Sequence, residues 1–113
     1  MITAVCALGL ASPAQATGGY LCRTADGSDI ELALGFGHVP GAPLIGTRLR
    51  VAGKTVPVNT PQWWLDDTEM RVMLTDADML ETLAIMRVVP QGRSLDGWIE
   101  WRGKRRWIRC YEN

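Results

Sequence analysis

Acidic side chains gather in the middle of this 113-residue sequence, where paired carboxylates could act as a general acid and base. Such clusters are more often the solvated ends of strands, because a catalytic acid needs a pKa that burial or a neighbouring charge has shifted. The cluster also lacks the glycine and the twelve-residue spacing of a calcium loop. We therefore expect neither hydrolysis nor calcium binding from Asp66, Asp67, Glu69, Asp76, Asp78 and Glu81.

Other signatures of catalysis or cofactor binding are missing. His38 is the only histidine, and it lies in a Gly/Pro-rich segment, 37–43, that we expect to be a surface loop. The sequence contains no Gly-x-Ser-x-Gly elbow, phosphate-binding loop or dinucleotide fingerprint. Lys plus Arg equals Asp plus Glu at twelve each, so no global charge favours nucleic acid. We expect a protein that is not an enzyme and that carries no metal and no cofactor.

The most unusual run of side chains is WIEWRGKRRWIR, residues 98–109, in which indoles alternate with cations. Two β-forming runs flank Gly103 and Lys104, which predicts a hairpin with these two as the turn residues, in a type II′ turn. In that register one face can pack on the core, and it holds Ile99, Trp101, Ile108 and Cys110. The outward face holds Trp98, Glu100, Arg102, Arg105, Trp107 and Arg109.

The outward face of this hairpin has two interpretations. Contacts of Arg over indole contribute about 0.5 to 1 kcal/mol at exposed sites, so the face can simply stabilise itself. Alternatively, guanidiniums fork onto carboxylates or phosphates while indoles stack on sugar rings or pack against a partner. With Lys104, residues 102–109 hold five positive charges in eight positions. The second interpretation predicts a surface for an acidic protein or an anionic glycan.

The first sixteen residues look like a secretory signal peptide. They carry no charge, are rich in small and apolar residues, and end in Ala14-Gln15-Ala16, a small-x-small cleavage pattern. A signal peptide normally starts with Lys or Arg, and the first here is Arg23, so we expect the true translation start to lie upstream. The stretch is shorter than the roughly 20 apolar residues that span a bilayer. We expect a periplasmic or secreted protein of residues 17–113, with a buried N-terminal strand or helix as the alternative.

Two cysteines remain after such a cleavage, Cys22 near the new start and Cys110 near the end. In an oxidising compartment they would form a disulfide that closes nearly the whole domain. The chain-entropy model gives such a loop roughly 4 to 5 kcal/mol of stabilisation. A pair of reduced thiols is the alternative if the chain is not exported.

Strand patterns recur along the chain. Apolar residues alternate over 30–36, and the β-rich segment 44–58 surrounds Gly53-Lys54, which predicts a second hairpin. Segments 70–74 and 83–89 predict a third hairpin, although Thr75-x-x-Asp78 and the spacing after it also suit a helix over 75–88. Of the adjacent Trp63 and Trp64, we expect one in the core and the other exposed. The pattern predicts a single all-β domain, a small antiparallel barrel or sandwich of seven or eight strands.

Three features together resemble the small periplasmic or membrane-bound inhibitors of c-type lysozyme: Tyr20-Leu21-Cys22, a cysteine near the end, and a Trp-rich β chain between them. Ser94-Leu95-Asp96-Gly97 is similar to one motif of that family, and Trp101-Arg102-Gly103-Lys104 to the other with Gly and Lys reversed. The resemblance implies an antiparallel β-barrel in which Ser94 and Lys104 enter the lysozyme cleft.

From these patterns we expect an exported, non-catalytic binding module of the bacterial cell envelope, which meets its partner through the C-terminal hairpin. A lysozyme inhibitor is the first alternative. A purely structural envelope domain is the second.

Overall fold

The computed structural model describes residues 17–37 and 44–113, and all regular secondary structure in these ranges is β-strand. The predicted signal peptide and residues 38–43 of the predicted loop lie outside the described residues. Nine strands are described, so the expected number of seven or eight was too low. They are β1 (Thr17–Thr24), β2 (Ile30–Gly37), β3 (Leu44–Val51), β4 (Lys54–Val56), β5 (Asn59–Leu65), β6 (Met70–Thr75), β7 (Thr82–Gln91), β8 (Ser94–Trp101) and β9 (Lys104–Glu112).

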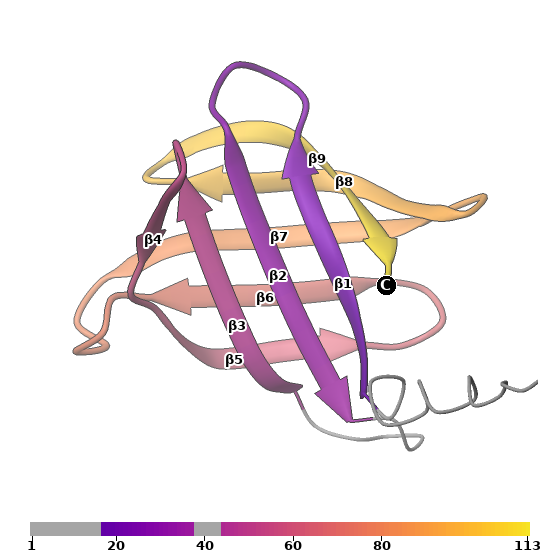
Figure 1. The fold of residues 1–113 in the computed structure, drawn as a ribbon, viewed down its shortest axis with the longest axis horizontal. Coiled ribbons are helices and arrows are strands. Elements are labelled where there is room, and N and C mark those ends of the chain that lie inside the picture. Colours follow the sequence, from indigo (N-terminus) through magenta and orange to yellow (C-terminus); the bar gives the residue numbers. More distant parts are fainter. Residues whose placement is uncertain (1–16, 38–43) are drawn as a thin grey trace, which may run out of the picture.

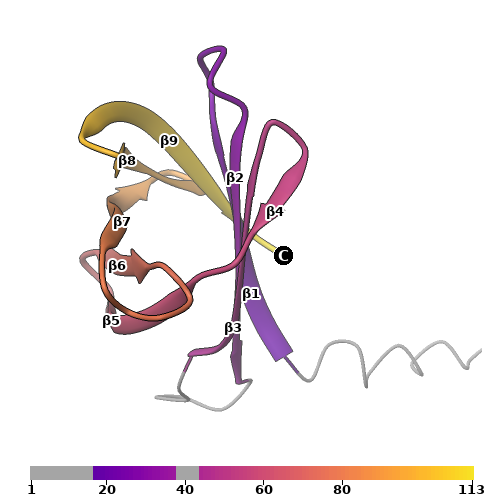
Figure 2. The ribbon, with the colours of Figure 1, turned by 90° about the vertical axis from the view of Figure 1, so that its left-hand side faces the viewer.

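All nine strands form one antiparallel sheet in the order β4-β3-β2-β1-β9-β8-β7-β6-β5. Each neighbouring pair is a hairpin except β1 and β9, which join the two ends of the domain at the middle of the sheet. The sheet curls into a half-barrel, so that β1–β3 cross in front of β5–β8 at a steep angle (Figure 1). The predicted all-β class is confirmed, and the architecture is closer to a barrel than to a sandwich of two separate sheets. Figure 2 shows β5–β8 curving away from the layer of β1–β3.

The two Gly-Lys hairpins turn one residue earlier than predicted. Their central residues all have positive φ: Ala52 at 53° and Gly53 at 79°, Arg102 at 50° and Gly103 at 83°. Two positive φ values define a type I′ turn, whose twist matches that of the strands, whereas the expected type II′ turn needs only one. The predicted turn residues Gly53-Lys54 and Gly103-Lys104 were therefore wrong.

Apart from Arg102, which was predicted on the outward face and lies in the turn, the predicted faces of the last hairpin are nevertheless those observed. Moving the turn by one residue moves every cross-strand partner by two, and side chains alternate with a period of two. Trp98 therefore lies opposite Trp107 instead of Arg109, and Glu100 opposite Arg105. Ile99, Ile108 and Cys110 are buried in the core, as the sequence pattern predicted.

The segment with competing strand and helix patterns forms the β6–β7 hairpin. The Asp76 carboxylate accepts hydrogen bonds from the backbone N–H groups of Leu80 at 2.7 Å and Glu81 at 3.2 Å. These bonds close the loop between the strands, so Asp76 satisfies backbone donors without starting a helix.

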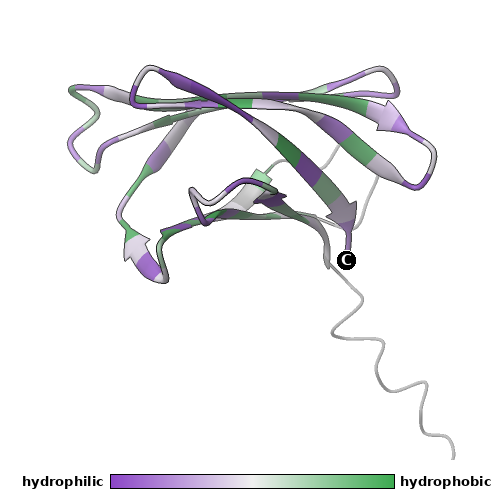
Figure 3. Ribbon diagram, turned by 90° about the horizontal axis from the view of Figure 1, so that it is seen from above, coloured by the Kyte–Doolittle hydropathy of each residue, from purple (hydrophilic) through white to green (hydrophobic). Residues whose placement is uncertain are grey.

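The core fills the concave side of the sheet, and Figure 3 shows apolar and polar residues alternating along the strands. Buried side chains come from both halves of the sheet, and the Cys22–Cys110 disulfide lies among them. Side chains also connect edge strand β5 with the other half of the sheet: Thr60 Oγ1 donates to Thr47 Oγ1 of β3 at 2.9 Å, and the Trp63 ring meets Phe36 of β2 edge-on at 5.5 Å. The largest fully buried side chains are Ile30, Leu32, Leu34, Leu49, Met70, Leu74, Met86 and Ile99.

The expectation for the adjacent tryptophans was wrong in one part. Trp63 and Trp64 do point to opposite faces, since Trp63 pairs with buried Val72 and Trp64 with exposed Arg71. Neither is a core residue, however, because 37% of Trp63 and 49% of Trp64 is exposed. Trp63 stays partly exposed because β5 is the last strand of the sheet, so no further strand covers it.

Candidate binding surface

A row of indoles and guanidiniums crosses the outer face of five adjacent strands. The registers pair Trp64 with Arg71, Arg71 with Arg87, Arg87 with Trp98, and Trp98 with Trp107. Paired residues on antiparallel strands point to the same side, so all five side chains share one face. Neighbouring strands lie about 4.8 Å apart, which makes the row about 19 Å long. We call Trp64, Arg71, Arg87, Trp98 and Trp107 the Trp–Arg row.

The three indoles of the row differ in how they are held. Trp107 is 74% exposed and is the most open aromatic side chain of the row. Trp98 is half-buried, with the Arg105 guanidinium 4.0 Å above its ring centre. Trp64 donates its Nε1–H to Asp66 at 2.8 Å, and Arg71 lies 5.7 Å from its ring centre. These contacts hold Trp64 and Trp98 in place, which lowers the entropy cost of binding through them.

At the centre of the row, two arginines share one carboxylate. Arg71 and Arg87 both contact Oε1 of Glu69 through Nε, at 3.5 Å and 2.8 Å. One carboxylate thus serves two guanidiniums, and both arginine side chains are about half exposed. Because the contacts use Nε, the terminal Nη groups remain free to donate to a ligand carboxylate.

The positive run of the C-terminal hairpin is largely neutralised. Arg105 pairs with Glu100 at 2.9 Å. Arg109 forms a two-bond contact with Asp96, at 2.9 Å and 2.8 Å. The Arg109 guanidinium and the Ser94 hydroxyl lower the pKa of Asp96, so that carboxylate stays charged.

The remaining cations of the hairpin lie near its turn. Arg106 points inward and bonds Asp26 at 3.0 Å, while its buried Nε has no hydrogen-bond partner in the structure. Among the described residues, Arg102 and Lys104 form no ion pair with a carboxylate, and the Arg102 guanidinium lies 4.9 Å from the Trp101 ring centre. The open cations of the hairpin are therefore at its tip, beyond the row.

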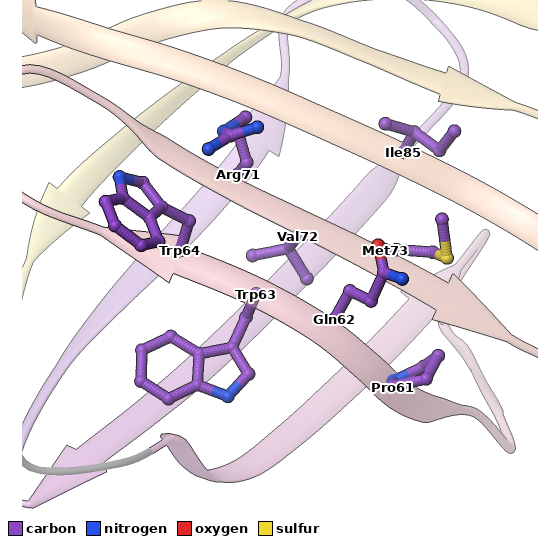
Figure 4. Close-up of a pocket in the computed structure, with 8 residues that line it drawn as sticks. All are labelled: Pro61, Gln62, Trp63, Trp64, Arg71, Val72, Met73 and Ile85. Atoms are coloured by element: carbon purple, nitrogen blue, oxygen red, sulfur yellow. The ribbon is translucent and has the colours of Figure 1, made fainter.

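Two depressions flank the ends of the row. The larger, of about 500 Å³, lies beside Trp64 and Arg71 and continues along Met73 and Ile85 (Figure 4). The other, of about 360 Å³, lies between Trp98 and Trp107 and includes Arg87 and Asp96. Both bring an indole together with an arginine, the combination that suits a ligand with flat apolar faces and acidic groups.

The two residues implied by the lysozyme-inhibitor resemblance lie apart. Ser94 begins β8, where its hydroxyl bonds Asp96 at 2.8 Å, whereas Lys104 pairs with Trp101 at the other end of that strand. Seven residue steps along a strand separate these ends by about 24 Å. The structure does not bring Ser94 and Lys104 together.

The sequence pattern predicted only the C-terminal part of this surface. The predicted residues Trp98, Trp107 and Arg105 lie together with Arg109 on the outer face, whereas Trp64, Arg71 and Arg87 were not predicted as site residues. The alternation in β6 and β7 does mark Arg71 and Arg87 as outward residues. Their alignment with Trp98 depends on two strand registers, β6–β7 and β7–β8, which the sequence pattern alone left open.

Within residues 17–37 and 44–113, no group of three or more His, Cys, Asp or Glu is arranged to hold a metal ion. The same part of the chain has no helix that is long and apolar enough to cross a membrane.

The fold and the surface define a small, disulfide-linked antiparallel β domain with an outward Trp–Arg row. Comparison of the chain with protein-family models, with curated proteins and with solved structures gives no match.

Proposed function

We propose that this protein is an exported, non-catalytic binding module of the bacterial cell envelope, and that it binds an acidic partner on the Trp–Arg row. The observation that carries the proposal is the alignment of three indoles and two guanidiniums on one outer face. Large apolar rings on a wet face cost hydration, and several of them in line are typical of a binding surface. Aromatic residues and arginine are also the residues most often responsible for binding energy.

The disulfide supports the exported location. Cys22 and Cys110 are buried and bonded to each other. Such bonds form and persist in oxidising compartments and are rare in the cytosol.

Inhibition of c-type lysozyme is the alternative that the resemblance implies. That alternative requires Ser94 and Lys104 to contact the same enzyme. The proposed binding surface, the Trp–Arg row, includes neither residue. If purified protein in large molar excess inhibits c-type lysozyme, and the changes Ser94→Ala and Lys104→Ala remove the inhibition, the alternative is correct. A purely structural role is the other alternative, and a specific ligand would contradict it.

The test is capture from an envelope extract with three forms of the protein. The wild type is compared with the double variant Trp107→Ala/Arg105→Glu. The control is Arg48→Glu, which changes an exposed arginine on β3. We expect the wild type and the control to retain the same component and the double variant to lose it. If all three forms retain every detected component equally well, the proposal is wrong.

A further inference from the structure

We infer that the ligand of the Trp–Arg row is a linear acidic glycan, whose chain runs across the strands with sugar rings on the indoles and a carboxylate on Arg71 and Arg87. This inference rests on the proposed function and names the class of ligand for the same surface.

The two arginines at the centre of the row favour an anionic ligand. Arg71 and Arg87 both contact a single Glu69 carboxylate through Nε, so the two guanidiniums share one ion-pair partner. Both side chains are about half exposed, and the two Nη groups of a guanidinium suit a two-bond contact with a carboxylate. A second carboxylate at this position would complete the pairing that Glu69 provides only in part.

The indoles on either side suit the flat faces of sugar rings. Trp64 lies beside Arg71 at one end, and Trp107 lies two strands beyond Arg87 at the other. An aromatic ring presents an apolar face, and a sugar ring has C–H groups on its own faces that can lie against it. The order of the row, with aromatic groups around a central cationic pair, therefore matches a chain of sugar units that carries carboxylates.

The polar groups around the row favour a glycan over an acidic protein. A protein partner of ordinary strength buries about 800 Å² on each side, around a central patch that is depleted of Lys, Glu and Asp. Here the outer face surrounds its indoles with ion pairs, among them Arg105–Glu100 and Arg109–Asp96. Carboxylates and guanidiniums at this spacing can exchange hydrogen bonds with sugar hydroxyls.

The other half of the sheet contains a natural control. On β1–β3, Glu31 lies between Arg23 and Arg50, which it contacts at 2.8 Å and 3.5 Å. This triplet has the same ratio of charges as Arg71, Glu69 and Arg87, and Arg50 is 44% exposed against 49% for Arg87. None of its members pairs across the strands with an indole. If charge alone determined binding, the two triplets would be equivalent.

The experiment measures binding of defined oligomers by calorimetry, using full-length protein that has been exported and whose disulfide is verified by mass spectrometry. The acidic probes are the hexamers of galacturonic acid and of mannuronic acid. Maltohexaose is the neutral probe, and hexaglutamate is the acidic peptide. The variants are Arg87→Gln, Trp64→Ala and Trp107→Ala, with Arg50→Gln as the matched control, and circular dichroism verifies that each is folded.

We expect at least one acidic hexamer to bind, and maltohexaose to bind at least about tenfold more weakly. Arg87→Gln should lower the affinity for the acidic hexamer about tenfold and leave the affinity for maltohexaose unchanged. Each tryptophan change should weaken binding of both glycans by about tenfold. Arg50→Gln should behave as the wild type.

Failure of the glycan inference is distinguishable from failure of the proposed function. If hexaglutamate binds in a way that depends on the row and neither acidic hexamer binds, the glycan inference is wrong and the row remains a binding surface. An acidic hexamer that binds equally well to Arg87→Gln also overturns the inference. If no probe binds and no component of an envelope extract distinguishes the row variants from the wild type, both proposals fail.

Discussion

Cys22 lies directly opposite Cys110 in the β1–β9 ladder, and the two sulfurs are bonded. This ladder is the only one in the sheet that joins strands distant in sequence, because every other pair is a hairpin of consecutive strands. The disulfide therefore fixes the one strand pairing of the described sheet that joins the two series of consecutive hairpins.

Replacement of both cysteines by alanine should lower the free energy of unfolding by about 2 to 5 kcal/mol. The chain between them, which spans a sequence separation of 88, would gain freedom mainly in the unfolded state. Urea unfolding of wild type and Cys22→Ala/Cys110→Ala, each with and without reductant, measures the change. The reductant should destabilise only the wild type, and equal midpoints for all four samples would contradict the prediction.

Gly97 allows β7 and β8 to approach closely. An added Cβ there would overlap the carbonyl oxygen of Arg87 and lie 2.8 Å from the Cα of Val88. Both contacts are to backbone, so the change Gly97→Ala must move one strand. We expect it to cost about 1 to 3 kcal/mol, which is typical of overpacking.

Gly46 provides the control for that change. It also lies in a strand, but an added Cβ there meets no atom within 4 Å. Gly46→Ala should shift the free energy of unfolding by no more than about 0.5 kcal/mol. If thermal or urea unfolding shows equal effects at both positions, the close approach at Gly97 does not constrain the fold.

The acidic loop before β6 should make the stability depend on pH. Asp66 accepts four hydrogen bonds, from the side chain and backbone of Thr68, the indole of Trp64 and the backbone of Glu69. These bonds, those from Thr68 above all, lower the pKa of Asp66 from 3.8 to about 2. Because the pKa is lower in the folded protein, the stabilisation is fully present above about pH 4 and is lost as the pH falls toward 2.

The variant Asp66→Asn tests this dependence. Its stability should be lower than that of the wild type at pH 6, and the difference should shrink between pH 4 and pH 2, as measured by urea unfolding at each pH. Asp67→Asn changes an exposed neighbour that accepts none of the four bonds, and its curve should run parallel to that of the wild type. A constant difference between Asp66→Asn and the wild type would show that the carboxylate is not the group responsible.

Local pattern was sufficient to predict the strand class, the three hairpins and the disulfide, because each depends on residues near in sequence or on a single cysteine pair. It missed β1, and it gave no bounds for β5, although the expectation for Trp63 and Trp64 assumed a strand there. Two glycines and a paired cysteine interrupt the alternation of β1, and Pro61 and two adjacent tryptophans interrupt that of β5. The Trp–Arg row could not be predicted from the sequence for another reason. Its members come from five strands, and a change of one residue in the position of a turn changes every cross-strand partner in that hairpin.

The turn at Ala52 and Gly53 should become more stable when its first residue is changed to asparagine. Ala52 has φ of 53°, in the left-handed region that costs a residue with a Cβ about 1 kcal/mol and that asparagine tolerates better. Type I′ turns prefer Asn-Gly for this reason, so Ala52→Asn should raise the free energy of unfolding by about 0.5 to 1 kcal/mol. The backbone bond from Ala52 N–H to the Asp29 carbonyl at 2.9 Å does not depend on the side chain. Ala52→Val, which adds a β-branched side chain at the same φ, should lower the stability instead, and urea unfolding that gives both variants the same sign would contradict the type I′ assignment.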